Sequence, residues 1–347
     1  MITMRSTKNS IISFAASCIL SLPLQAQTRG FFRSYGDSIT AGYKLVKDDQ
    51  YPEMISQKLQ LDYENLAVSG QTTCQMSYNQ VFRENANSLR ESVFSTMMIG
   101  TNDSNVEGAG AYQKVYEKCL TASVAWLAFP KSDKFSPFST ACVKKGKWLP
   151  SVEMPTTGLR SNITNDELSC SITTDGAPIY VWHDFGDDLN ALFDVVLDGQ
   201  TMATVSTHAA IQIKTRDGRG IRGQSLLKVT ASPGVHQIKF IIRSVNGHYP
   251  TIYGIGSLKN RQAPVQLFTA GVPYQLNMIK ENEVILYNSI AQNAVTRFQN
   301  EGFPLQFVDV RQYWRPNADQ MMDTLHPNRN GNQSLSRAFV DKISAVK

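Results

Sequence analysis

Two short motifs, far apart in the sequence, carry the residue types that acyl transfer requires. A Gly-Asp-Ser triplet at 36–38 puts the hydroxyl of Ser38 directly after an apolar segment, and Asp323 precedes His326 by three residues. At this spacing a carboxylate and an imidazole can meet when the backbone makes a single turn, so that Asp323 orients the ring and His326 acts as a base. We therefore expect Ser38 to be the nucleophile, provided that folding brings the two ends of the chain together.

Two further segments end in residues that could stabilise the oxyanion formed by such an attack. Gly70 follows the segment 65–68, and Asn102 lies in a Gly-Thr-Asn-Asp motif at 100–103 that follows the apolar run 92–99. Glycine lets a backbone N–H approach closely, and the asparagine side chain supplies an amide donor. Each well-placed donor contributes about 3 kcal/mol to the stability of the transition state. The sequence thus predicts that three segment ends converge at one place.

The elements that must position these residues alternate between strand and helix. The runs 31–35, 63–68 and 92–99 predict strands, Pro52 opens a helix, and the periodicity of 111–127 predicts a second helix. Alternating strands and helices form parallel sheets, which bind ligands at the carboxyl ends of their strands. Ser38, Gly70 and Asn102 all follow such predicted ends.

The chain changes character after Pro130, and from about Trp148 to Leu258 it contains β-rich runs separated by Asp-Gly and Pro-Gly turns. These runs lie at 179–182, 192–197, 209–214, 225–230 and 237–242. Their spacing predicts an antiparallel β-sandwich of about 110 residues.

After Gln262 the alternating pattern returns, with strands predicted at 265–270 and 305–310 and helices at 276–300 and 332–345. The α/β domain is therefore expected to be split around the sandwich. We place its two parts at 27–145 and 261–347 and the inserted domain, with carbohydrate binding as its candidate role, at 146–260.

The first 26 residues have the pattern of a secretory signal peptide. Arg5 and Lys8 precede an apolar run at 11–24, and a cleavage site follows at Ala26. The run is interrupted by serines and is short for a membrane span, so we expect a secreted or periplasmic protein without stable membrane insertion. The mature formal charge is (34 − 2) − 29 = +3, which indicates no nucleic-acid partner.

Four cysteines remain after this cleavage: Cys74, Cys119, Cys142 and Cys170. An even number in an exported chain predicts two disulfides. Three pairings are open, and Cys119 with Cys142 would close the shortest loop between consecutive cysteines.

Other candidate ligand-binding residues lie in the β-rich segment. Its histidines, which lack the close spacing of a metal-ligand pair, are His183, His208, His236 and His248. A Gly-x-Gly-x-x-Gly pattern at 218–223 is followed by no predicted helix, so it fails the context of a dinucleotide site. We therefore expect neither a metal nor a cofactor. Aromatic residues of the same region could stack on sugars, namely Trp148, Tyr180, Trp182 and Tyr249, but the apolar neighbours of Trp182 favour a place in the core.

Taken in order, the triplet at 36–38, Gly70, the motif at 100–103 and the segment 323–326 resemble the four sequence blocks of the SGNH (GDSL-type) hydrolase family. This resemblance implies an α/β fold, namely a flavodoxin-like three-layer α/β/α domain with a parallel sheet, here interrupted by the all-β sandwich. Arg33 makes the first strand more polar than the family pattern, and the insertion is a second departure.

The resemblance also implies a role for each matched residue. Ser38 is similar to the family's nucleophile, His326 to its base and Asp323 to the carboxylate that orients the base. The oxyanion hole would consist of the backbone N–H groups of Ser38 and Gly70 and the side chain of Asn102.

The family contains carbohydrate O-acetylesterases, lipases and thioesterases, so the resemblance implies a carboxylic ester hydrolase more directly than a substrate. Export and the added sandwich favour a serine esterase that removes acyl, in first place acetyl, groups from a carbohydrate through an acyl-enzyme. Its partner would be an acylated small molecule or polysaccharide. The alternatives are a lipase or thioesterase of the same family, and a glycan-binding protein whose hydrolase domain is vestigial.

Overall fold

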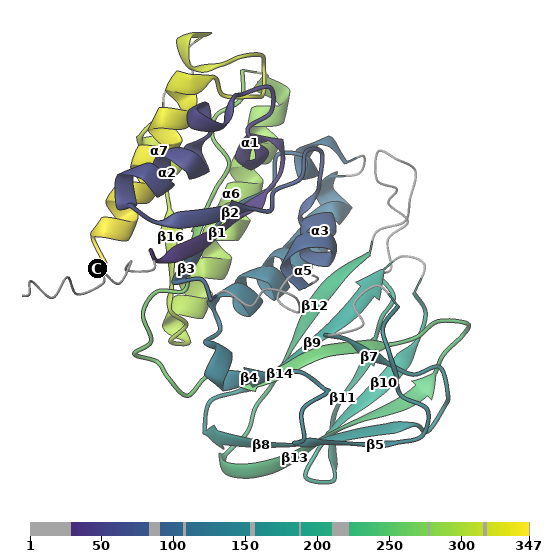
Figure 1. Ribbon diagram of the computed structural model, residues 1–347. Helices are drawn as coiled ribbons and strands as arrows, with labels where there is room; N and C mark the ends of the chain where they lie inside the picture. Colours follow the sequence, from purple (N-terminus) through teal and green to yellow (C-terminus); the bar gives the residue numbers. More distant parts are fainter. Residues whose placement is uncertain are drawn as a thin grey trace, which may run out of the picture.

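The computed structural model describes residues 29–82, 91–106, 109–152, 157–186, 189–209, 222–276, 278–314 and 318–346. An α/β part and an antiparallel β part lie side by side (Figure 1). The predicted signal peptide lies outside the described residues, as do 210–214 of one expected strand and most of the glycine pattern at 218–223. In the described part of the chain no helix is long and apolar enough to cross a membrane.

The α/β part is built on a five-stranded parallel sheet. Its strands are β1 (Phe31–Gly36), β2 (Asp62–Asn65), β3 (Phe94–Met98), β15 (Leu267–Ala270) and β16 (Leu305–Val308). They are ordered β16-β15-β3-β1-β2. Numbered along the chain, this is the flavodoxin-like order 2-1-3-4-5, in which ligands bind where the order reverses beside the first strand. The predicted fold class is confirmed, and Ser38 follows the strand at this reversal.

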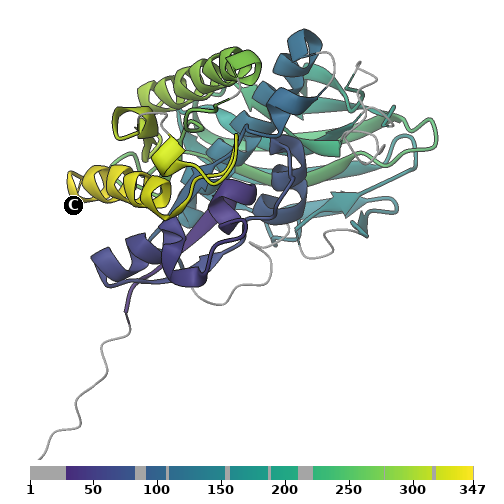
Figure 2. The same cartoon turned by 90° about the horizontal axis from the view of Figure 1, so that it is seen from above.

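Helices cover both faces of the parallel sheet (Figures 1 and 2). They are α2 (Tyr51–Leu59) and α7 (Arg329–Ser344) on one face, and α5 (Ala109–Ala128) and α6 (Met278–Asn300) on the other. Strands β1, β3 and β15 are buried on both faces: Phe32 packs in the cluster of α2 and α7, while Met97 packs in the cluster of α5 and α6. This burial on both sides explains why the strands read as continuous apolar runs.

The polar residues of β1 are paired with neighbouring strands. Arg33 is 3% exposed, and its Nε donates to Glu64 of β2 at 3.1 Å. The Ser34 and Thr96 hydroxyls lie 2.8 Å apart between β1 and β3. The departure from the family pattern in this strand is therefore accommodated within the sheet.

The inserted part consists of two antiparallel sheets. One contains β12 (Arg222–Val229), β9 (Ile179–Gly186), β14 (Thr251–Ser257), β7 (Leu159–Arg160) and β6 (Leu149–Pro150), with β4 (Lys134–Phe135) beside β14. The other contains β11 (Gln200–Ser206), β10 (Leu192–Leu197), β13 (Pro233–Ser244), β8 (Glu167–Asp175) and β5 (Cys142–Lys145). Buried residues of both sheets form one apolar core. The predicted sandwich is confirmed; the domain limits at 146 and 260 stay predictions.

Helix α5 joins the two parts because it is covered on both sides. Trp126 at its C-terminal end meets Trp182 of β9 edge to face, with the ring centroids 5.2 Å apart. A side chain at position 254 of β14 would come within 2.6 Å of Trp126, so the approach requires Gly254. Trp182 is fully buried, as its neighbours predict. Sandwich and α/β part therefore share a continuous core.

Two disulfides form, as predicted, but Cys119 and Cys142, the pair with the shortest loop, are not bonded to each other. Cys74 of α3 (Thr73–Met76) is bonded to Cys119 of α5, and Cys142 of β5 is bonded to Cys170, its direct partner across the ladder in β8. The first bond therefore fixes α3 on α5, and the second lies within the sandwich.

Candidate active site

Ser38 begins the short helix α1 (Ser38–Ala41) directly after β1. Asp37 caps this helix, with its Oδ1 accepting the N–H of Ile39 at 3.0 Å. A Cβ at Gly36 would lie 2.5 Å from the carbonyl oxygen of Met98, so only glycine allows the turn to pass so close to β3. The result is a serine held at the carboxyl edge of the sheet and only 4% exposed.

His326 and Asp323 lie on the loop before α7. The Nε2 of His326 is 3.0 Å from the Oγ of Ser38, and its Nδ1 is 2.9 Å from Oδ2 of Asp323. The other carboxylate oxygen accepts the backbone N–H groups of Leu325 at 2.8 Å and His326 at 2.7 Å. The single backbone turn expected from the spacing is thus closed by the carboxylate itself. Two residues separated by most of the chain come within hydrogen-bonding distance.

The environment of Asp323 keeps it charged. Its partial burial would raise the pKa of the carboxyl, but the N–H groups of His326 and Leu325 and the imidazole outweigh this and hold the pKa below its ordinary value. A charged carboxylate fixes the proton of the imidazole on Nδ1 and leaves Nε2 free to accept the proton of Ser38. The three side chains can therefore perform the proton transfer that nucleophilic attack requires.

Asn102 and Gly70 belong to adjoining loops. Asn102, after β3, donates from Nδ2 to the carbonyl oxygen of Gln71 at 2.9 Å. Gly70 has a φ of +82°, and no atom lies near the position of a Cβ, so the left-handed backbone rather than crowding favours glycine here. An amide nitrogen carries two protons, and this bond uses one of them. The second remains available for an oxyanion.

Gln80 connects this loop to the end of β1, a role that the sequence analysis missed. Its Nε2 donates to the carbonyl oxygen of Gly36 at 3.0 Å and to Oε1 of Gln71 at 2.5 Å. The N–H of Gly36 donates back to Oε1 of Gln80 at 3.3 Å. Gln80 lies in the π-helical turn η2 (Ser77–Val81), and no motif surrounds it, so the sequence held no signal for it.

Asp103 fixes the N-terminus of α3 behind the same loop. Its carboxylate accepts the backbone N–H of Thr73 at 3.0 Å, the hydroxyl of Thr73 at 3.0 Å and the hydroxyl of Tyr112 at 2.8 Å. Burial raises its pKa to about 6 against these donors. Burial likewise raises the pKa of Asp37 to about 7, and the nearby charge of Asp103 adds to this. The motif at 100–103 could have indicated Asp103, but its spacing assigned it no function.

Tyr43 is a further neighbour of the imidazole that the sequence analysis missed. Its ring centroid lies 4.3 Å from that of His326, with 31° between the planes. Its backbone N–H donates to the carbonyl oxygen of Ser38 at 3.0 Å. One face of the base is therefore covered by an aromatic ring that is tied to the serine turn.

The histidines of the sandwich lie apart from this site. Burial lowers the pKa of His183 to about 4, and His236 is hydrogen-bonded to Asp198 at 2.6 Å. Across the residues that the structure describes, no three His, Cys, Asp or Glu side chains are gathered as a metal site.

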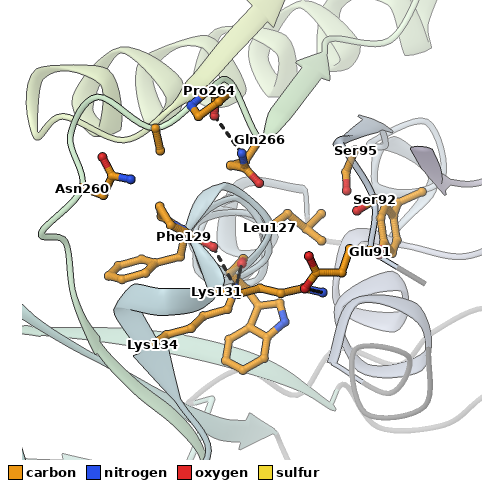
Figure 3. A pocket seen from close by; sticks show the side chains of 14 residues that line it. Glu91, Ser92, Ser95, Leu127, Phe129, Lys131, Lys134, Asn260, Pro264 and Gln266 are labelled. Atoms are coloured by element: carbon orange, nitrogen blue, oxygen red, sulfur yellow. Dashed lines mark hydrogen bonds and ion pairs between the residues drawn. The ribbon is translucent and has the colours of Figure 1, made fainter. Parts of the chain in front are cut away.

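A cavity of about 260 Å³ lies at the opposite edge of the parallel sheet, near the start of β3 and the C-terminal end of α5 (Figure 3). Lys131 and Glu91 form an ion pair of 3.1 Å beside it. Lys134 donates to the carbonyl oxygens of Trp126 and Phe129, and burial lowers its pKa to about 7. These bonds satisfy carbonyls at the end of α5, so Lys134 has a capping role.

No family model and no curated protein match the sequence. Among solved structures, a member of the lipolytic protein G-D-S-L family from Veillonella parvula DSM 2008 is similar over 90% of this chain and 98% of its own, at 10% identity and a TM-score of 0.43. A two-domain esterase active on acetylated mannans, co-crystallized with mannopentaose, is similar over 66% of this chain and 91% of its own. The identity is 11% and the TM-score 0.38. A family 35 carbohydrate binding module from an environmental isolate is similar over 37% of this chain and 93% of its own. The identity is 14% and the TM-score 0.28. At these identities and TM-scores, the function has to be argued from the residues of this chain.

Proposed function

We propose that this chain is a serine esterase of the SGNH type that hydrolyses acyl, in first place acetyl, esters on a carbohydrate. The proposal rests on the 3.0 Å distance between the Oγ of Ser38 and the Nε2 of His326, together with the 2.9 Å bond from that ring to Asp323. A hydroxyl, an imidazole and a carboxylate in this order form the arrangement that activates a serine nucleophile.

In the proposed reaction, Ser38 attacks the acyl carbonyl carbon while His326 takes the hydroxyl proton. The carbonyl oxygen becomes an oxyanion, which accepts hydrogen bonds from the N–H groups of Ser38 and Gly70 and from the amide of Asn102. His326 then gives its proton to the departing sugar oxygen, leaving an acyl-Ser38. Water resolves this ester with His326 as base, and no cofactor takes part.

The carbohydrate half of the proposal is supported by the chain's own organisation. The β-sandwich packs on α5 and adds a surface that could hold a glycan to the α/β domain, which carries the candidate active site. We further propose that the segment 1–26 directs export and is removed after Ala26, which would expose the protein to extracellular or periplasmic glycans.

The test compares the wild-type chain with a Ser38→Ala variant on p-nitrophenyl acetate and on longer acyl esters. We expect turnover to be lost in the variant while thermal unfolding stays unchanged, and a fluorophosphonate to label the wild-type chain at Ser38 only. Preference for acetyl over longer chains supports deacetylation and opposes a lipase. Full turnover by the variant overturns the assignment.

A further inference from the structure

A second cavity, of about 230 Å³, lies at the junction between the sandwich and the α/β part. Tyr78 of η2 contributes to its wall, and the remaining lining residues belong to the sandwich. Ser38, His326 and Asp323 do not line it. It is therefore a separate feature from the candidate active site, although one element of that site borders it.

The polar wall combines an acceptor with cations. Asp184 of β9 is 7% exposed, and its Oδ1 is held by the N–H of Thr251 at 2.9 Å. Burial raises the pKa of this carboxyl to about 7, and the positive charge of Arg222 opposes the rise. Arg160 and Arg222 both line the cavity and supply donors.

The aromatic wall is exposed and is held in position. Tyr249 is 36% exposed, and the guanidinium carbon of Arg160 lies 4.4 Å from its ring centroid. A cation stacked on a ring limits the rotation of both side chains. The cavity thus offers a fixed ring beside fixed donors and an acceptor.

We propose that this cavity binds a pyranose unit of a neutral glycan. The apolar C–H face of a sugar packs on an aromatic ring, and its vicinal hydroxyls need an acceptor and donors side by side, as Asp184 and the two arginines provide. The inference rests on the proposed function for the identity of the attached ester, and it adds a binding site for the chain that carries it.

The helix between the two sites gives the cavity its relation to Ser38. Ser77 donates to Oε1 of Gln224 in β12 at 2.6 Å, whereas Gln80, one turn later, binds Gly36. Tyr78 lies between them in sequence. A glycan unit held in the cavity is therefore separated from Ser38 by this helical turn, and a glycan that occupies both places has to extend past it. The protein would therefore act on polymers or long oligosaccharides in preference to single sugars.

Binding is measured first, on the full chain with Ser38→Ala so that no ester is consumed. The probes are deacetylated glucomannan and xylan as neutral glycans and polygalacturonate as an acidic one. We expect a neutral glycan to bind, and Tyr249→Ala and Arg160→Met each to weaken it about tenfold. Phe138→Ala removes a sandwich ring of similar exposure, 40%, and should leave binding unchanged. Thermal unfolding confirms that each variant is folded.

Kinetics supply the second measurement, on variants that retain Ser38. The ratio of kcat/KM on acetylated polymer to kcat/KM on p-nitrophenyl acetate should fall about tenfold in Tyr249→Ala and stay at the wild-type value in Phe138→Ala. Equal glycan binding by Tyr249→Ala, or binding of polygalacturonate alone, overturns the inference. A different outcome separates the two proposals. If the wild-type chain hydrolyses no ester but Tyr249→Ala still weakens glycan binding, the cavity assignment stands and the proposed reaction fails.

Discussion

The ring of Tyr43 lies against the imidazole of His326, with the two centroids 4.3 Å apart. This contact places the negative face of an aromatic ring beside the group that becomes positively charged when Ser38 loses its proton. A cation over an aromatic ring is stabilised by about 1 kcal/mol at a half-exposed site. The contact therefore acts on the proposed reaction although Tyr43 bears no proton that the reaction needs.

We predict that Tyr43→Ala lowers kcat on p-nitrophenyl acetate about fivefold, the equivalent of about 1 kcal/mol. Tyr43→Phe keeps the ring and should retain most of the wild-type kcat. Steady-state kinetics of the two variants measure the difference. Equal losses in both would contradict this reading, because they would assign the effect to the hydroxyl.

Asp323→Asn should lower kcat by about 10³ to 10⁴ while leaving the fold intact. The Oδ1 of asparagine still accepts the N–H groups of Leu325 and His326, so the turn is kept. The new NH₂ group, however, donates to Nδ1 and moves the imidazole proton to Nε2, where it prevents acceptance from Ser38. Kinetics beside thermal unfolding separate these effects; a loss of kcat below tenfold would show that Asp323 does not orient the base.

Asn102→Ala should lower kcat about 10² to 10³ with little change in KM, because the amide donates to charge that develops only in the transition state. The substitution also removes the bond to Gln71, which could shift the loop. Gln71→Ala is the control for a loop shift, since it removes the bond between this loop and Gln80 but leaves the Asn102 amide in place. A rise in KM with unchanged kcat would refute an oxyanion role.

Asp37 should make the chain less stable as the pH rises from about 4 to about 7. Its pKa is raised from 3.8 to about 7 in the folded state. Between these values the folded chain binds the proton that the unfolded chain has released, so the free energy of unfolding decreases with increasing pH. Asp37→Asn keeps an N-cap and does not titrate, so it should flatten the slope. Urea unfolding across this pH range measures the slope of the free energy of unfolding against pH. Asp48→Asn, at an exposed position, is the control. An unchanged slope in Asp37→Asn would show that Asp37 does not cause the pH dependence.

The two disulfides should contribute similarly to stability and differently to activity. Their loops of 45 and 28 residues each correspond to about 4 kcal/mol in the chain-entropy account. Loss of Cys74–Cys119 frees α3, whose N-terminus Asp103 ties to the Asn102 loop, so esterase activity should fall. Loss of Cys142–Cys170 affects the sandwich alone. Alanine pairs at each bond, assayed for unfolding and for turnover, test this; equal activity losses would argue against a role of α3 in the site.

Much of the fold could be predicted because its signals are local. Strands buried on both faces read as apolar runs, and turn residues marked the limits of β10. Strands β9 and β13 are longer than predicted, and the Pro-Gly pair expected as a turn lies inside β13. The disulfide pairing could not be read in the same way, because it depends on the register that sets Cys142 opposite Cys170. The sequence left three pairings open, and the pair with the shortest loop, Cys119 with Cys142, does not form.

The candidate site likewise contains residues that local motifs predict and residues that they do not. Ser38, Asp323 and His326 stand in short motifs whose spacing has chemical meaning, and the structure brings them into one hydrogen-bonded series; their catalytic roles stay predictions. Gln80 and Tyr43 act through contacts formed only in three dimensions. A glutamine in a helical segment and a tyrosine after a glycine turn have many uses, so their types gave no indication.

The pairing of β3 with β15 sets Met98 beside Ala270, with the whole sandwich between them in sequence. During folding, this contact must close a very long loop, which slows assembly of the parallel sheet. A sandwich that folds first would bring its own ends together and shorten the effective loop. The insertion would then act as an intramolecular folding aid, and mutations that delay it would trap the first three strands with their edge at β3 unpaired.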